Sequence, residues 1–258
     1  MFVAPVRTHS RIVGALMMRE IMTRYGREGL GFLWLVAEPL VFCLGVLVMW
    51  SFLKPPYEHG IRLGPFVMTG YMCLLMLRHL MASLMSALQA NSGLLYHSRV
   101  SILHIYISRI LLEVSGASVA FMIVYAILIM LGQVSLPHDY GLFVGGWLLM
   151  AWLGSGLALI FSGLAIRSEL FERLTSFLTY ALIPISGAFA MASFFPEAYR
   201  DTYLLIPFPH ATEMIRGAVF GEFVPTYYDA AYAFFCGAVL NFLGLVLIAT
   251  ARDHLEVE

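Results

Sequence analysis

The stretch GFLWLVAEPLVFCLGVLVMWSFL, from Gly31 to Leu53, holds one charged side chain, Glu38, among 23 residues. Its length is close to the roughly 20 apolar residues that a helix needs to cross the hydrocarbon core of a bilayer. The whole chain has the same character, since 60% of its 258 residues are hydrophobic and 12% are charged, against about 25% charged in ordinary soluble domains. We therefore expect an all-α integral membrane protein that forms one domain over residues 1–258.

Five further apolar stretches follow, each long enough to cross a membrane as a helix. They predict six transmembrane helices in all, at about residues 31–53, 64–88, 103–131, 140–166, 174–194 and 228–250. Most connections are short and carry turn formers or charges, so no second domain fits between the spans. The longest, residues 195–227, is broken by four prolines into apolar pieces too short to cross. We expect a re-entrant helix pair there, on the periplasmic side, that acts as an outer gate.

The first 28 residues carry five arginines and no long apolar run. In a helix, Ile12, Leu16 and Met17 fall on one side and arginines on the other. This pattern predicts an amphipathic helix over residues 1–28 that lies in the membrane interface, and it does not fit a cleaved signal peptide.

Basic residues are distributed unevenly between the two sides of the predicted spans. With a cytoplasmic N-terminus, ten arginines lie on that side and four basic residues on the other, which favours two cytoplasmic termini. The first group is Arg7, Arg11, Arg19, Arg24, Arg27, Arg99, Arg109, Arg167, Arg173 and Arg252, and the second is Lys54, Arg62, Arg200 and Arg216. The polar stretch NSGLLYHSRVSILH, residues 91–104, then becomes a cytoplasmic loop.

Several kinds of chemistry are excluded by the residues present. The one lysine, Lys54, precedes a proline at the end of a span, so the chain has no Gly-rich phosphate loop and cannot hydrolyse ATP by that route. No His-Glu-x-x-His pair or Gly-x-Ser-x-Gly elbow is present, and the adjacent His138 and Asp139 fit a turn. A net charge of −1 offers no basic footprint for nucleic acid. We expect no enzyme activity, no metal site and no nucleic-acid partner.

We single out four of the ionisable side chains that fall inside predicted spans, where each costs roughly 2.5 kcal/mol or more to insert. They are Glu38, Arg78, His79 and Glu113. Two interpretations remain open. The groups pair inside the bundle, with Arg78 next to Glu38 or Glu113, or they line a transport pathway.

Several motifs together resemble one family. They are LMMREIMTRYGREGLGFLWLVAEP (residues 16–39), ANSGLLYHSRV (90–100), SRILLE (108–113) and PFPHATEMIR (207–216). The chain resembles the membrane permeases of type-2 ABC exporters that move polysaccharide, most closely those for capsular polysaccharide. The resemblance covers almost the whole chain. One departure is at Ile102, Leu103 and His104, where the family usually has Pro, an aliphatic residue and Asp.

The resemblance implies a homodimer in the bacterial inner membrane, paired with two cytosolic ATPase subunits. Those subunits would hold ATP and Mg, and this chain would carry no cofactor. The substrate would be a lipid-linked acidic polysaccharide, and periplasmic co-polymerase-type and outer-membrane proteins would continue its route. O-antigen and teichoic acid glycans are alternative substrates. An ion-coupled secondary transporter is a different class, but it usually brings internal repeats that are not visible here.

The residues themselves and the resemblance together indicate candidate site residues in three groups. The ATPase-coupling group is Tyr96, His97, Ser98, Arg99 and Ser101 with Arg19 and Glu20. The substrate-pathway group is Arg24, Tyr25, Arg27, Trp34, Glu38, Arg78 and His79. The outer-gate group is Pro207, His210, Glu213 and Arg216, whose last three members recur at three-residue spacing and share one helical side. Simpler roles remain open, namely a solvated loop, attraction of the arginines to anionic phospholipid, and a gate trio that only holds its hairpin together.

Overall fold

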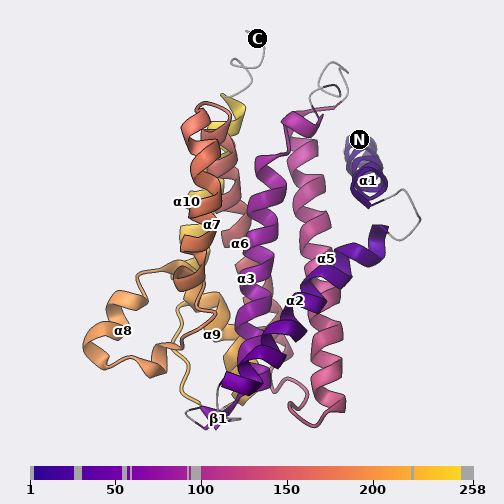
Figure 1. The fold of residues 1–258 in the computed structure, drawn as a ribbon. Coiled ribbons are helices and arrows are strands. Elements are labelled where there is room, and N and C mark those ends of the chain that lie inside the picture. Colours follow the sequence, from indigo (N-terminus) through magenta and orange to yellow (C-terminus); the bar gives the residue numbers. More distant parts are fainter. Residues whose placement is uncertain are drawn as a thin grey trace.

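A computed structural model describes residues 3–25, 31–53, 57–58, 60–91, 93, 100–221 and 224–250. Long helices run side by side as a bundle (Figure 1), and α2 crosses the others obliquely. These helices are α2 (Gly31–Leu53), α3 (Leu63–Met85), α5 (Ile102–Met130), α6 (Tyr140–Ala165), α7 (Glu169–Ile185) and α10 (Ala230–Ala249). The described part of the chain is thus almost entirely helical, as the sequence predicts.

Five of the described helices are long and apolar enough to cross a membrane: α2, α3, α5, α6 and α10. The remaining predicted span corresponds to α7, which has 17 residues and begins and ends earlier than the predicted range 174–194. The chain leaves the helix at Gly187, whose φ of 74° is open to glycine and strained for most other residues. Six full spans therefore stay a prediction.

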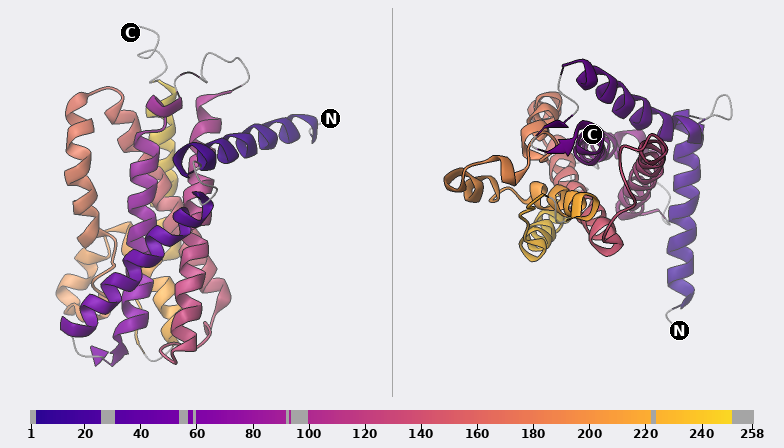
Figure 2. Two further views of the ribbon diagram at one scale, coloured as in Figure 1. Left: turned by 45° about the vertical axis from the view of Figure 1, so that its right-hand side comes forward. Right: turned by 90° about the horizontal axis from the view of Figure 1, so that it is seen from below.

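Helix α1 (Val3–Tyr25) lies across the bundle at the end where α5 begins (Figure 2). Leu16 is buried in the hydrophobic core and Ile12 packs against it, while Met18 and Met22 are exposed. The apolar side predicted from the sequence therefore faces the protein in part. We call this end of the bundle, with α1 and the start of α5, the α1 end.

The opposite end, the α9 end, carries the segment between α7 and α10 (Figure 1). This segment contains the 3-10 turn η2 (Ala192–Phe194), α8 (Glu197–Tyr203) and α9 (Pro207–Phe220). The same end of the bundle also carries a hairpin of two short strands between α2 and α3, β1 (Tyr57–Glu58) and β2 (Ile61–Arg62). Two helices too short to span were expected here. We also expected Pro207 to Pro209 to form the turn between these two helices, but both prolines lie in the first turn of α9, where a missing backbone N–H costs nothing.

Helix α6 lies at the centre of the packing, against α3, α9 and α10. Glycines on its surface allow backbones to approach closely, which is how membrane helices pack without a hydrophobic driving force. A Cβ atom added at Gly156 would lie 2.8 Å from the backbone nitrogen of Asn241 on α10, and one added at Gly146 would lie 2.9 Å from the carbonyl oxygen of Ala211 on α9. These contacts fix α10 and α9 against one scaffold.

Candidate functional site

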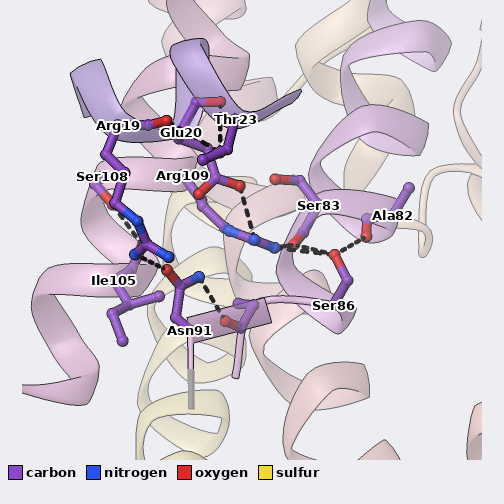
Figure 3. A network of polar contacts seen from close by, with 11 residues as sticks. Arg19, Glu20, Thr23, Ala82, Ser83, Ser86, Asn91, Ile105, Ser108 and Arg109 are labelled. Carbon is purple, nitrogen blue, oxygen red and sulfur yellow. Dashed lines mark hydrogen bonds and ion pairs between the residues drawn. The ribbon is translucent and has the colours of Figure 1, made fainter. Parts of the chain in front are cut away.

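A buried arginine joins three helices at the α1 end (Figure 3). Arg109 of α5 is 2% exposed, and its Nη2 lies 2.7 Å from Oε1 of Glu20 on α1. Its Nη1 donates to the carbonyl oxygen of Ser83 and, at 2.9 Å, to Oγ of Ser86, both at the end of α3. One guanidinium therefore links α1, α3 and α5. Sequence analysis counted Arg109 as a basic charge and as part of the SRILLE motif but gave it no contact; the signal available was an arginine within a largely apolar helix.

A second contact ties α1 to the segment that follows α3. Arg19 Nη1 donates to Oδ1 of Asn91 at 2.8 Å, and Nδ2 of Asn91 donates to the carbonyl oxygen of Ala87 at 2.9 Å. Asn91 ends the 3-10 turn η1 (Gln89–Asn91) and opens the predicted coupling loop. Arg19 and Glu20, both predicted to face the ATPase, thus hold α1 against its own chain (Figure 3).

The same loop ends in a helix cap built on histidine. Ser101 is the N-cap of α5: its Oγ accepts from the backbone N–H of His104, and its own N–H donates to Nδ1 of His104 at 3.1 Å. Because Nδ1 accepts, Nε2 carries the proton, and it lies 2.7 Å from Nδ1 of His9 on α1. His104, the departure from the family pattern, therefore takes the reciprocal part that an acidic residue plays in a capping box. It also fixes the start of α5 at Ile102.

Several predicted residues cannot be placed. Tyr96, His97, Ser98, Arg99 and Arg27 lie outside the described residues. For Arg24 and Tyr25 the structure describes the end of α1 but not the side chains. Trp34, in contrast, is described and is 61% exposed on α2.

The ionisable groups within the spans meet around His79 of α3. Its Nε2 lies 4.0 Å from Oε1 of Glu38 on α2, and its Nδ1 lies 3.9 Å from Oε2 of Glu113 on α5. Among the described residues no ion pair joins Arg78 to either carboxylate, and the observed contacts of Glu38 and Glu113 with α3 are made by His79. Adjacent helical positions point about 100° apart, so only one of the two basic residues faces both neighbouring helices.

Arg216 of α9 is fully buried at the α9 end. Its Nη1 donates to the carbonyl oxygens of Gly187 at 2.8 Å and Ala190 at 2.7 Å, and its Nη2 donates to that of Ala188 at 2.7 Å. The guanidinium thus satisfies the irregular backbone that follows α7. Gly70 of α3 makes room for this contact, since a Cβ atom there would lie 2.2 Å from the oxygen of Ala188.

Glu213 holds the two flanks of α9 in place. Its Oε1 accepts from the backbone N–H of Ala192 and its Oε2 from that of Tyr227, both at 3.1 Å, and Oε1 lies 4.0 Å from Nη1 of Arg216. Burial raises the pKa of the Glu213 carboxyl, while Arg216 and the two N–H groups oppose the rise. The carboxylate therefore acts as a fixed acceptor for backbone on both sides of the helix.

His210 completes the trio with one bond from each ring nitrogen. Nδ1 accepts from the backbone N–H of Asp229 at 2.8 Å, and Nε2 lies 2.8 Å from the carbonyl oxygen of Leu204. The three predicted gate residues do share one buried side of α9, but each bonds to a different stretch of backbone. Their observed contacts are those that hold the hairpin together.

The described residues contain no group of three or more His, Cys, Asp or Glu side chains placed to hold a metal ion. At both ends of the bundle, the described polar side chains form hydrogen bonds and ion pairs that connect helices and the segments between them.

Comparison with known proteins identifies the kind of membrane protein that carries these contacts. Residues 11–220 match the ABC-2 type transporter family. The chain is 37% identical to the capsule polysaccharide export inner-membrane protein CtrC of Neisseria meningitidis, over 95% of this chain and 93% of that protein. It is 37% identical to the corresponding protein BexB of Haemophilus influenzae over the same shares, and 26% identical to the polysialic acid transport protein KpsM of Escherichia coli over 93% of each. With a family match over most of its length and relatives that align nearly end to end, the chain belongs to the ABC-2 type transporter family.

Proposed function

We propose that the chain is the membrane-spanning permease subunit of an ATP-driven exporter that moves lipid-linked capsular polysaccharide across the bacterial inner membrane. One observation carries this proposal: the chain aligns over 95% of its length with inner-membrane proteins of capsule export. Relatives of this kind are transport subunits, and the lysine content of the chain excludes a phosphate-binding loop of its own. The motor is therefore a separate subunit.

Two such permeases would form the pathway together with two ATPase subunits, which bind ATP and Mg. Helix α2 supports a second copy as its neighbour, because large apolar side chains such as Trp34, Phe42 and Phe52 are exposed along it. We place the α1 end in the cytoplasm, on the distribution of basic residues. The α9 end then faces the periplasm, where co-polymerase-type and outer-membrane proteins would receive the glycan.

The geometry suggests how ATPase movement would reach the spans. The predicted coupling loop begins at Asn91 and ends at Ser101, and both ends are tied to α1, through Arg19 and through the pair His104 and His9. Arg109 joins α1 to α3 and α5, the helices on either side of the loop. A push on the loop would therefore move α1, α3 and α5 together. The arginines at the end of α1 would meet the acidic head of the substrate at the inner mouth.

The proposal is tested by replacing His97–Arg99 with Gly and Ser in the native strain. We expect polysaccharide to accumulate inside the cell and to fall at the surface, with the permease still inserted and ATP hydrolysis no longer coupled to export. The same replacement at Ser135–Pro137, in the loop at the α9 end, serves as the control. Normal surface polysaccharide in a strain that lacks the permease altogether would refute the function, and normal export by the loop variant would refute the coupling role.

A further inference from the structure

A cavity of about 500 Å³ opens at the α9 end, between the end of α8, the start of α9 and the start of α10. Its lining includes Tyr227, Tyr228 and Tyr232, together with Asp229 and His210. None of the described lining residues is Lys or Arg. The volume falls within the roughly 300–1,000 Å³ of ordinary small-molecule sites.

The three tyrosines give the cavity apolar ring faces next to polar hydroxyls. Tyr228 is 41% exposed and Tyr232 is 37% exposed. Tyr227 already carries a stacked partner, because Cζ of Arg200 lies 4.1 Å from its ring centroid. Among the described residues the Tyr227 and Tyr228 hydroxyls have no hydrogen-bond partner in the structure. These hydroxyls are therefore able to bond to a ligand.

Asp229 adds an acceptor at the wall. Its Oδ1 accepts from the backbone N–H of Tyr232 at 2.9 Å and caps α10, and within the described chain Oδ2 has no such bond. Oδ1 thus fixes the orientation of the carboxylate, and Oδ2 is available to accept a hydrogen bond from a ligand.

Hydrogen bonds hold the walls in position. His210 bridges Leu204 and Asp229, the N–H of Tyr227 is held by Glu213, and the Tyr232 hydroxyl donates to the carbonyl oxygen of Leu205 at 2.7 Å. A site whose walls are already ordered loses less entropy when a ligand binds. The walls of the cavity are therefore held in place without a ligand.

We propose that this cavity is a saccharide subsite that holds one or two sugar units of the glycan at the periplasmic end of the permease. The proposal rests on the proposed function and adds a place of contact to it. The C–H face of a sugar ring matches a tyrosine face, and its hydroxyls supply the donors that Asp229 and the phenols accept. A phospholipid phosphate or an acidic sugar brings a negative charge that needs basic partners, whereas the described lining holds Asp229 and no Lys or Arg, so the subsite fits neutral sugar units of the glycan.

Photo-crosslinking in the native strain tests the site whatever sugars the glycan contains. The probe is p-benzoylphenylalanine in place of Tyr228, which has no hydrogen bond to lose in the described structure. After irradiation we expect the permease band to shift to a heterogeneous, carbohydrate-positive adduct that is absent from a strain unable to make the polysaccharide. In the same background, Asp229→Asn keeps the helix cap and removes the charge, and the adduct should fall about fivefold or more.

The matched control is the same probe at Tyr199 of α8, an exposed tyrosine on the same segment but outside the cavity. If the Tyr228 variant fails to accumulate, the probe at Tyr227 provides the second position. The subsite is refuted if no glycan adduct forms while polysaccharide still reaches the surface, if the cavity and control positions give equal adducts, or if only phospholipid is captured. Failure of the proposed exporter function is distinguished from failure of the subsite, because in that case a strain without the permease would still show polysaccharide at its surface.

Discussion

Two buried arginines, one at each end of the bundle, do different structural work. Arg109 bonds mainly to side chains and to one helix end: the carboxylate of Glu20, the hydroxyl of Ser86 and the carbonyl of Ser83. Arg216 bonds to three backbone carbonyls of one irregular segment and lies farther, at 4.0 Å, from its carboxylate. The first arginine joins separate helices, whereas the second replaces the hydrogen bonds that a helix would have made.

The contacts of Arg109 and those of Arg216 differ in the free energy that breaking them costs. The contacts of Arg109 run mainly through the side chains of Glu20 and Ser86, which can change rotamer when the three helices move. The carbonyl groups that follow α7 are fixed in the backbone and cannot turn away in this manner. Each buried carbonyl that loses its hydrogen bond costs roughly 1–3 kcal/mol. The α1 end is thus suited to movement and the α9 end to rigidity.

The largest effect is expected from Arg216→Met. It leaves three carbonyls without a donor and Glu213 without its cation, and removing one partner of a buried pair costs about 3–5 kcal/mol. We expect little protein to be extracted in folded form, with a lower unfolding midpoint in detergent. Arg200→Met, which removes only a half-buried stacking contact and one hydrogen bond, is the control. An unchanged midpoint for Arg216→Met would contradict a rigid α9 end.

A second expected effect comes from Gly70→Ala. The new Cβ atom would overlap the oxygen of Ala188 at 2.2 Å and push the segment away from Arg216, a kind of overpacking that costs about 1–3 kcal/mol. Gly64→Ala on the same helix is the matched control, because its Cβ atom would have no neighbour closer than 3.5 Å. Equal midpoints for the two variants would show that the close approach of Ala188 is unimportant.

At the α1 end, Glu20→Gln should be milder than Arg216→Met. It weakens the ion pair with Arg109 and lowers stability by about 1.5–3 kcal/mol, the range for hydrogen bonds to charged groups. A double-mutant cycle with Arg109→Met isolates the pair, and Thr23→Val, which loses only bonds to carbonyls of its own helix, is the control. If the cycle gives no coupling energy, α1 is not held by this pair.

The smallest effect is expected from Asn91→Ala. It removes the bond from Arg19 and the bond from Nδ2 of Asn91 to the carbonyl oxygen of Ala87, and we expect a loss of about 1–2 kcal/mol in unfolding free energy. Arg19→Met in the Asn91→Ala background should then cost nothing more. A further drop in the double variant would show that Arg19 has another partner that matters.

The bounds of a transmembrane helix are the feature that the sequence predicts best, because the lipid constrains them most. Helix α2 spans Gly31–Leu53 as expected, because hydrocarbon requires an unbroken apolar helix and leaves few alternatives. Helix α7 ends at Ile185, before its predicted end at residue 194, because its end depends on Arg216, which lies on α9 farther along the chain. Spacing placed His210, Glu213 and Arg216 on one side of α9, but it could not name their backbone partners.

Local substitutions were similarly hard to interpret from the sequence alone. His104 departs from the aspartate that is usual in the family, yet it completes a capping box through Nδ1 and reaches α1 through Nε2. The second contact depends on His9, 95 residues away. His79 rather than Arg78 faces the two carboxylates for a similar reason, since rotation of α3 about its own axis is set by packing and not by spacing.

The shortness of α7 bears on the lipid around it. Seventeen residues rise about 26 Å, less than the roughly 30 Å of an average hydrocarbon core. A bilayer around α7 would have to become locally thinner to match the length of the helix. This mismatch between helix length and hydrocarbon thickness costs a fraction of a kcal/mol per Å. A bilayer crossed by α7 would therefore be thinner beside this helix, and a polymer passing there would have to be kept from hydrocarbon over a shorter distance.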